Sequence, residues 1–127
     1  MSASRGLDAA IYIGTPTPTL IAQLSGIDFN WERAYTEWVR MGSLEADQVL
    51  LGVIRHRGAF RKAFVDCTYF DYFMGGSVLI GSIVPRSGIS IVGNLVITGG
   101  NLANMEMENE AAVIEEGSFV MYNVSCT

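Results

Sequence analysis

The sequence predicts a mainly β protein, either an antiparallel β-sandwich or a rolled barrel, with one short flanking α-helix. Half of the 127 residues are apolar and 14 are glycines, a composition that indicates many short strands joined by tight turns. Apolar and polar side chains alternate along several stretches, whereas helical spacing of apolar residues occurs in one short stretch. A chain of this length is expected to form one domain with a real core.

Residues 1–17 are expected to form a flexible N-terminal arm ahead of a β domain over residues 18–127. The sequence GTPTPT at the end of the arm contains two prolines, which cannot donate hydrogen bonds to a β-ladder. Within the arm, AIYI at residues 10–13 could form a short strand.

A first long strand is expected after the arm, followed by a long loop at about residues 35–52. Apolar and polar residues alternate over residues 27–32, so one face of this strand is apolar and the other is wet. The loop region contains apolar residues whose exposure would be costly on a monomer, which favours a partner that covers them. These residues are Leu44, Val49, Leu50 and Leu51.

A basic strand is expected over residues 53–65. By parity, three arginines share one face, and the other face mixes basic and aromatic side chains. A row of planar guanidinium groups suits carboxylates or phosphates, although a solvated strand face would give the same pattern. The first face carries Arg55, Arg57 and Arg61, and the second carries His56, Phe60, Lys62 and Phe64.

The sequence DCTYFDYFMGG predicts the single short helix. Asp66 or Thr68 can cap its N-terminus, and Gly75 and Gly76 end it. Its apolar side chains recur at helical spacing, so the helix is expected to pack on the sheet with its aromatic rings in the core rather than around a cofactor. These side chains belong to Tyr69, Phe70, Phe73 and Met74.

The rest of the chain predicts four strands, at residues 77–84, 88–99, 103–114 and 118–126. The turn-forming sequences PRSG, GGN and EEGS separate them. The third strand places three glutamates on one face, where like charges repel unless they face water, a metal or a cationic partner. A wet face or a negatively charged channel wall is favoured over a metal site. The glutamates are Glu106, Glu108 and Glu110.

Composition and motifs weigh against several functional classes. A net charge of −5 argues against a dedicated nucleic-acid-binding domain, because phosphate binding depends on Lys and Arg. Without a long apolar run or a secretory segment, a soluble protein made in a cytoplasm is expected. Cys67 and Cys126 have no metal-site or disulfide spacing. His56 is the only usual catalytic base, and no nucleophile or nucleotide-binding motif occurs, so we expect no catalysis, cofactor or metal.

The order of these features resembles that of the tail tube proteins of tailed phages and archaeal viruses. An aromatic strand precedes a GS loop, a strand with RGAF leads to an aspartate and a short helix, and GNLVITG leads to a hairpin of two long final strands. The resemblance covers roughly residues 18–125.

The resemblance implies a β-sandwich whose subunits form hexameric rings by continuing their inner sheets around a closed barrel. The rings would stack into a tube for DNA passage without specific binding, in a virion tail assembled in the host cytoplasm. The loop at residues 35–52 would touch the adjacent ring. Expected partners are further copies of the chain and a tape measure, sheath or terminator protein, with no membrane.

The resemblance and strand parity together assign the site residues. The three glutamates of residues 103–114 are predicted to face the lumen, where six copies at −5 each give −30 per ring and keep DNA from sticking. The arginine face and the apolar loop residues are predicted to form subunit contacts. The arginines would pair with Glu45, Asp47, Glu115 or Glu116 across an interface. The ring-stacking loop is predicted to use Trp38, Arg40, Met41, Glu45 and Asp47.

Two alternative functions fit the same sequence. A small ligand-binding or enzymatic β-barrel would use the strand from Arg55 to Lys62 to bind an anion. Another virion ring protein, such as a connector, head decoration or baseplate component, would share the fold of a tube subunit.

Overall fold

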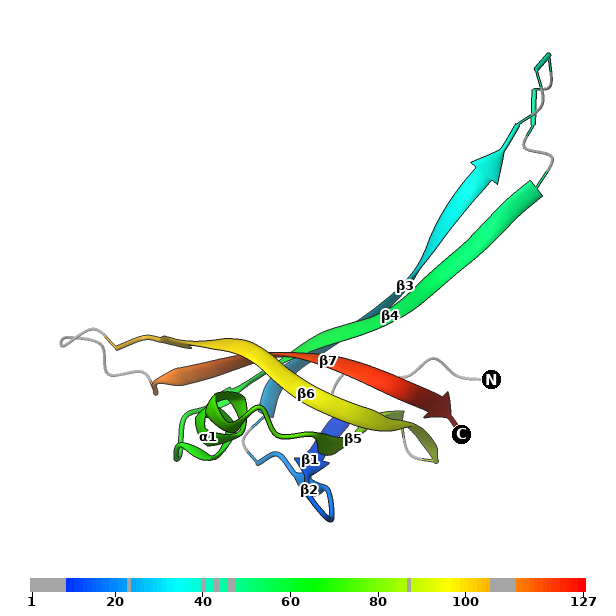
Figure 1. The fold of residues 1–127 in the computed structure, drawn as a ribbon. Helices are drawn as coiled ribbons and strands as arrows, with labels where there is room; N and C mark the ends of the chain where they lie inside the picture. The colour runs from blue at the N-terminus through cyan, green and yellow to red at the C-terminus, as the bar shows by residue number, and fades with distance from the viewer. Residues whose placement is uncertain are drawn as a thin grey trace.

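The computed structural model describes residues 9–22, 24–39, 41–42, 44–45, 48–86, 88–105 and 112–127. In chain order its elements are β1 (Ala10–Gly14), β2 (Thr19–Leu20), β3 (Leu24–Trp38), β4 (Gln48–Ala63), α1 (Thr68–Gly75), β5 (Leu79–Arg86), β6 (Ile89–Ala103) and β7 (Ile114–Cys126). Strands dominate these residues, and one short helix lies beside them (Figure 1). The predicted mainly β fold class with a short flanking helix is confirmed.

The described strands form one seven-stranded antiparallel sheet in the order β2-β1-β5-β6-β7-β4-β3. The sheet curls, because β1 and β3 contact each other although four strands separate them in this order. It remains open, so one chain gives a rolled sheet rather than a closed barrel. The core inside the curl consists of Ile11, Ile13, Ile21, Phe60, Leu79, Ile83, Leu95, Ile97, Phe119 and Met121.

Two phenylalanines at the centre of the core each lie against a glycine of the neighbouring strand. Phe60 of β4 lies opposite Gly117 of β7, and Phe119 of β7 lies opposite Gly58 of β4. A Cβ atom added at either glycine would lie 2.5 Å from an atom of the facing ring. The two rings stack with their centroids 6.5 Å apart. The glycines therefore provide the space that the rings occupy between β4 and β7.

The N-terminal region differs from the prediction of a flexible arm. Residues 10–14 form β1, which pairs with β5 along its whole length. Ile11 and Ile13 point into the core and are almost fully buried. The arm prediction is wrong for these residues because the prolines lie after the strand, in the connection to β2, where they remove no hydrogen bond from β1.

The predicted long loop at residues 35–52 is wrong at both ends, because residues 35–38 belong to β3 and residues 48–52 belong to β4. β3 and β4 continue their ladder outward to Trp38 opposite Gln48, so the connection between them is much shorter. A β-bulge interrupts the register between Arg33 and Tyr35. Bulges and mixed polar and apolar side chains obscure the two-residue period in this stretch, which explains why the sequence pattern indicated a loop.

The described residues of the C-terminal region form three strands, β5, β6 and β7, where the sequence predicted four. β6 ends at Ala103, which pairs directly with Ile114 at the start of β7. Residues 104–113 therefore connect these strands, and of them residues 106–111 lie outside the described part of the chain. The predicted turns GGN and EEGS lie inside β6 and β7. Their glycines misled the prediction, since Gly117 serves packing against Phe60 rather than a turn.

Helix α1 ends where the sequence indicated, but its N-cap residue is Cys67 and not the predicted Asp66 or Thr68. The Asp66 carboxylate accepts hydrogen bonds from the Thr68 amide and hydroxyl at 3.1 and 2.7 Å. Gly76 ends the helix in the left-handed region, with φ of 61°. Of the apolar side chains expected in the core, Tyr69 packs against it, whereas Phe70, Phe73 and Met74 are exposed, so the prediction is wrong for these three. Tyr72, which was not predicted, also packs against the core. Among the described residues, no helix is long and apolar enough to cross a membrane.

Candidate assembly interface

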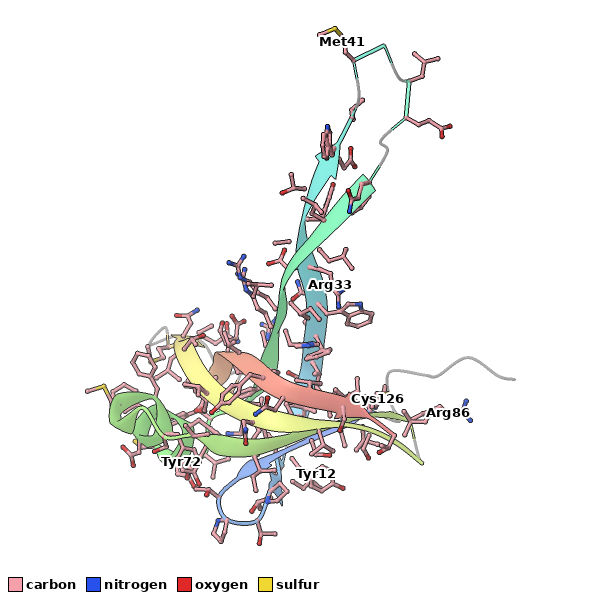
Figure 2. All side chains as sticks on the ribbon, turned by 45° about the vertical axis from the view of Figure 1, so that its right-hand side comes forward. Tyr12, Arg33, Met41, Tyr72, Arg86 and Cys126 are labelled. Carbon is pink, nitrogen blue, oxygen red and sulfur yellow. The ribbon has the colours of Figure 1, made fainter. Side chains whose placement is uncertain are left out.

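The outer half of the β3–β4 hairpin stands away from the rest of the molecule. β4 pairs with both β3 and β7 from His56 to Lys62, but its residues before His56 pair with β3 alone. Figure 1 shows this two-stranded ribbon rising from the sheet, and Figure 2 places Arg33 on it and Met41 at its end. All described residues from Trp31 to Arg55 are exposed. The ribbon therefore contributes no buried residue to the fold of a single chain.

Both faces of this ribbon carry exposed apolar side chains. Leu51 lies opposite Tyr35 on one face, and each is 64% exposed. Leu50, which lies opposite Thr36, projects from the other face and is 49% exposed. By strand alternation Val49 lies on the first face. Ile54 lies on that face too, because the bulge places it opposite Arg33, which shares a face of β3 with Tyr35. A monomer rarely exposes a continuous apolar surface of this kind, so the ribbon has the character of a contact surface.

The end of the hairpin is more exposed still. Met41 and Leu44 are about fully exposed, at 103% and 102%, and Trp38 and Val39 are 60% and 48% exposed. We call Trp38, Val39, Met41 and Leu44 the hairpin tip. Glu45 is exposed next to the tip. The predicted stacking residues Arg40 and Asp47 lie outside the described residues.

The predicted arginine face is exposed, but two of its members have partners within the chain. Arg57 lies 3.5 Å from Glu32 of β3, and Arg61 lies 3.4 Å from Glu116 of β7. All four side chains are more than two-fifths exposed. Arg55 lies opposite Glu32 in the ladder. The prediction that these arginines pair with acids of a neighbouring copy stays a prediction.

The sequence reasoning missed a buried ionisable pair on the opposite face of β4. Lys62 and Glu115 lie opposite each other on β4 and β7 and are 3% and 7% exposed. The Lys62 ammonium donates to the carbonyl of Ala63 at 2.8 Å and lies 5.4 Å from the centre of the Tyr69 ring. Burial raises the pKa of the Glu115 carboxyl, and Lys62 opposes that rise. The parity of Lys62, which it shares with Phe60, was the signal that could have revealed this burial.

An apolar groove of about 670 Å³ runs between α1 and strands β6 and β7. We call it the helix groove. Aromatic and aliphatic side chains line most of it, and Glu115 is one of its few charged groups. The Glu115 Oε1 atom is buried and has no hydrogen-bond partner in the described part of the chain. Its principal apolar side chains are Phe64, Phe70, Phe73, Leu102 and Met105.

Features expected of an enzyme are sparse in the described residues. The His56 ring stacks on Phe29, with centroids 5.9 Å apart, and no described residue forms a hydrogen bond with its buried Nδ1 atom. No group of three or more His, Cys, Asp or Glu side chains within the described ranges is placed to hold a metal ion. Cys67 and Cys126 are free and exposed. The predicted lumen acids, Glu106, Glu108 and Glu110, lie outside the described part of the chain.

Similar proteins are found when structures are compared, but not when sequences are compared. No family model matches the sequence, and no curated protein matches it significantly. A subunit from the tail of a gene transfer agent particle, solved with C6 symmetry, superimposes with a TM-score of 0.80 and 18% identity. That likeness covers 98% of this chain and 99% of the other.

Two further structures share the architecture. The SPP1 tail tube protein gives a TM-score of 0.75 at 11% identity, over 98% of this chain and 79% of the other. A chain of the sheath–tube complex of an extracellular contractile injection system gives 0.69 at 9% identity, over 98% and 91%. The chain described here therefore has the fold of tail tube proteins over nearly its whole length.

Proposed function

We propose that this chain is a structural subunit of a tail tube and that it self-assembles into six-membered rings that stack into a tube. The observation that carries the proposal is the free-standing hairpin with apolar side chains on both faces, in a chain with the tail tube fold. A surface of this kind is stable in water only when other protein covers it. Further copies of the same chain are the simplest cover, and the proposal assigns no catalytic role.

Ring formation has support from the open sheet. β3 is an edge strand along its full length, and at the other edge β2 covers only part of β1. Unpaired edges invite further strands, and closure of the sheet across several copies removes them. The C6 symmetry of the similar gene transfer agent tail supports six as the number of copies.

The proposed tube allows DNA to pass through its centre without specific binding. The net charge of each chain is negative, and a wall of like charge repels phosphate. By strand parity, Glu106, Glu108 and Glu110 remain our candidates for the lumen wall. A sheath, a terminator or a tape measure protein is the partner class that fits a tube in a virion tail.

Electron microscopy of the purified protein tests the proposal, across a range of concentration and salt. We expect rings and stacked tubes with a central hole. A protein that stays monomeric at high concentration in every condition would refute the proposed function.

Two hairpin variants sharpen this experiment. In the first, an Asn-Gly turn replaces residues 34–53 and joins Arg33 to Ile54, which pair in the ladder. In the second, Leu50, Leu51 and Val53 become threonines, which keep strand propensity and hairpin length but remove apolar surface. Both variants are expected to fold and to lose assembly, because no described residue in this part of the hairpin is buried. If the threonine variant forms normal tubes, apolar contact by the hairpin is not what drives assembly.

The arginine face gives less support to an anion-binding barrel. Arg57 and Arg61 already have carboxylate partners within the chain, so an anionic ligand would have to displace Glu32 and Glu116. Ring proteins at other positions in a virion fit the fold equally well, and the length of the assemblies seen by microscopy separates them from a tube subunit.

A further inference from the structure

We propose that the helix groove receives the hairpin tip of a second copy of this chain. This inference rests on the proposed tube function and adds the surface that the tip contacts. The groove and the tip both leave large apolar side chains without cover.

The groove has the size and lining to hold a few large apolar side chains. Its volume of about 670 Å³ lies within the range of roughly 300–1,000 Å³ found for sites that enclose a drug-sized group. Phe70 and Phe73 of α1 form one wall and are 59% and 41% exposed. Leu102 and Met105, at the end of β6 and just beyond it, line the groove as well.

The tip supplies side chains that match this lining. Met41 and Leu44 are about fully exposed, so they have the most apolar surface to gain by burial. Methionine is also unbranched and adapts to an irregular aromatic wall. Trp38 adds a large ring with an indole N–H that needs an acceptor when it is buried.

Glu115 provides that acceptor at the groove. The Glu115 residue is 7% exposed, and no group among the described residues forms a hydrogen bond with its buried Oε1 atom. An unpaired buried acceptor is costly, and an incoming N–H donor removes the cost. The groove therefore suits an apolar group that also carries a donor, as Trp38 does, better than a purely aliphatic one.

The tip cannot reach the groove of its own chain. Figure 1 shows the end of the hairpin and helix α1 at opposite ends of the molecule, and Figure 2 shows the same for Met41 and Tyr72. Contact between the tip of one copy and the groove of another is head-to-tail. Head-to-tail contacts do not satisfy themselves in a dimer and continue from copy to copy, as a growing tube requires.

Residues 106–111 of the same chain are the competing occupant of the groove, since they follow Met105. Three glutamates among them would bring further negative charge next to Glu115 and Glu116, which is unfavourable. The tip therefore fits better than this segment.

Disulfide trapping tests the contact directly, with Cys67 as a native reporter because it is exposed and lines the groove. In a C126S background, M41C is expected to link to Cys67 of another copy under mild oxidation, since a disulfide needs Cα atoms within about 7 Å. T36C, on the same hairpin but away from its end, is the matched control and should stay unlinked. Peptide mass spectrometry identifies the linked pair.

The outcomes of trapping separate the two proposals. If tubes form and M41C does not link to Cys67, or links mainly to M41C of another copy, this inference is overturned and the tube function stands. If the wild-type protein forms neither rings nor tubes, the tube function fails and the inference falls with it.

Substitutions in the groove give a second test. F70E places a charge in the groove wall, whereas M74E places one on the same helix at an exposed residue that does not line the groove. We expect F70E to lower the sedimentable fraction by about tenfold or more and M74E to leave it within about twofold. Equal effects of the two variants, with both folded by circular dichroism, would overturn the inference.

Mixing experiments test the head-to-tail direction. F70E copies keep an intact tip, and copies with M41E and L44E keep an intact groove. Each variant alone is expected to lack stacking, and a mixture should form joined pairs that grow no further, because one contact of each pair is intact. A mixture that remains as dissociated as either variant alone would contradict the assignment.

Discussion

The close contact between Phe60 and Gly117 predicts that a larger side chain at residue 117 lowers the free energy of unfolding. G117A adds a Cβ atom that would lie 2.5 Å from Cε1 of Phe60, whereas carbon atoms in contact prefer about 3.5–4.0 Å. The ring must therefore move by about 1 Å. It has little room to do so, because Phe60 is 1% exposed and its ring lies 5.2 Å from Tyr69 and 6.5 Å from Phe119, between centroids. Overpacking of this kind costs about 1–3 kcal/mol.

The matched control is G99A, in the neighbouring strand β6. A Cβ atom at Gly99 would have nothing within 4 Å, so this variant reports only the backbone effect of replacing glycine in a strand. That effect is expected to be neutral or to stabilise by up to about 1 kcal/mol. The melting temperature of G117A should therefore fall by roughly 4 °C for each kcal/mol lost, while that of G99A holds or rises.

Urea denaturation followed by circular dichroism measures these differences. The hairpin-shortened variant is the suitable background, because assembly would otherwise make the midpoint depend on concentration. F60L provides a further check, because it removes the ring atoms that lie close to Gly117. G117A should therefore lower the free energy of unfolding less in the F60L background than in the background with Phe60. If G117A and G99A have the same free energy of unfolding, the glycine does not serve to admit the Phe60 ring and the packing argument is wrong.

Three further predictions concern charged and titratable groups. Burial raises the pKa of Glu115 above its usual 4.5, so the folded chain binds this proton more tightly than the unfolded chain does. The free energy of unfolding should therefore fall as the pH rises from 4.5. Urea titrations at several pH values measure this decrease, which E115Q should lack. Burial, together with the nearby charge of Glu115, raises the pKa of Tyr69 from 10 to about 12. The free energy of unfolding should therefore fall as the pH rises between these values, and Y69F should lose less stability than wild type over the same range. R57A breaks an exposed ion pair with Glu32 and should change the free energy of unfolding by less than about 1 kcal/mol, and a larger loss would show that the pair supports the base of the hairpin.

Strand alternation predicted the parts of the fold in which one face is buried. It separated the exposed arginine face of β4 from the face that carries Phe60, and the structure has the same division. The same parity placed Lys62 with Phe60, but a lysine at a core position contradicts the ordinary preference of charged groups for water. Its burial depends on the Ala63 carbonyl, the Tyr69 ring and Glu115, and two of these partners come from elsewhere in the chain.

Glycine and proline gave the least reliable signals, because they serve packing as well as turns. Three glycines show two different roles. Gly76 adopts a left-handed backbone, whereas Gly58 and Gly117 leave space for phenylalanine rings of the neighbouring strand. A sequence does not reveal which ring faces which glycine until the strand register is known. The register of β4 and β7 brings together residues about sixty positions apart, so local pattern could not have supplied it.

The apolar residues of the hairpin could not be assigned to core or interface from sequence, since both uses demand the same side chains. β4 contains the two cases in one strand. From His56 onward it has neighbours on both sides and Phe60 reaches the core, whereas before His56 it has β3 alone and its side chains stay exposed. A two-stranded ribbon is marginally stable by itself in water, so the outer hairpin needs contacts that the chain does not provide. Under the proposed function, folding of the curled sheet and covering of the hairpin are separate events, and the second would depend on the concentration of other copies.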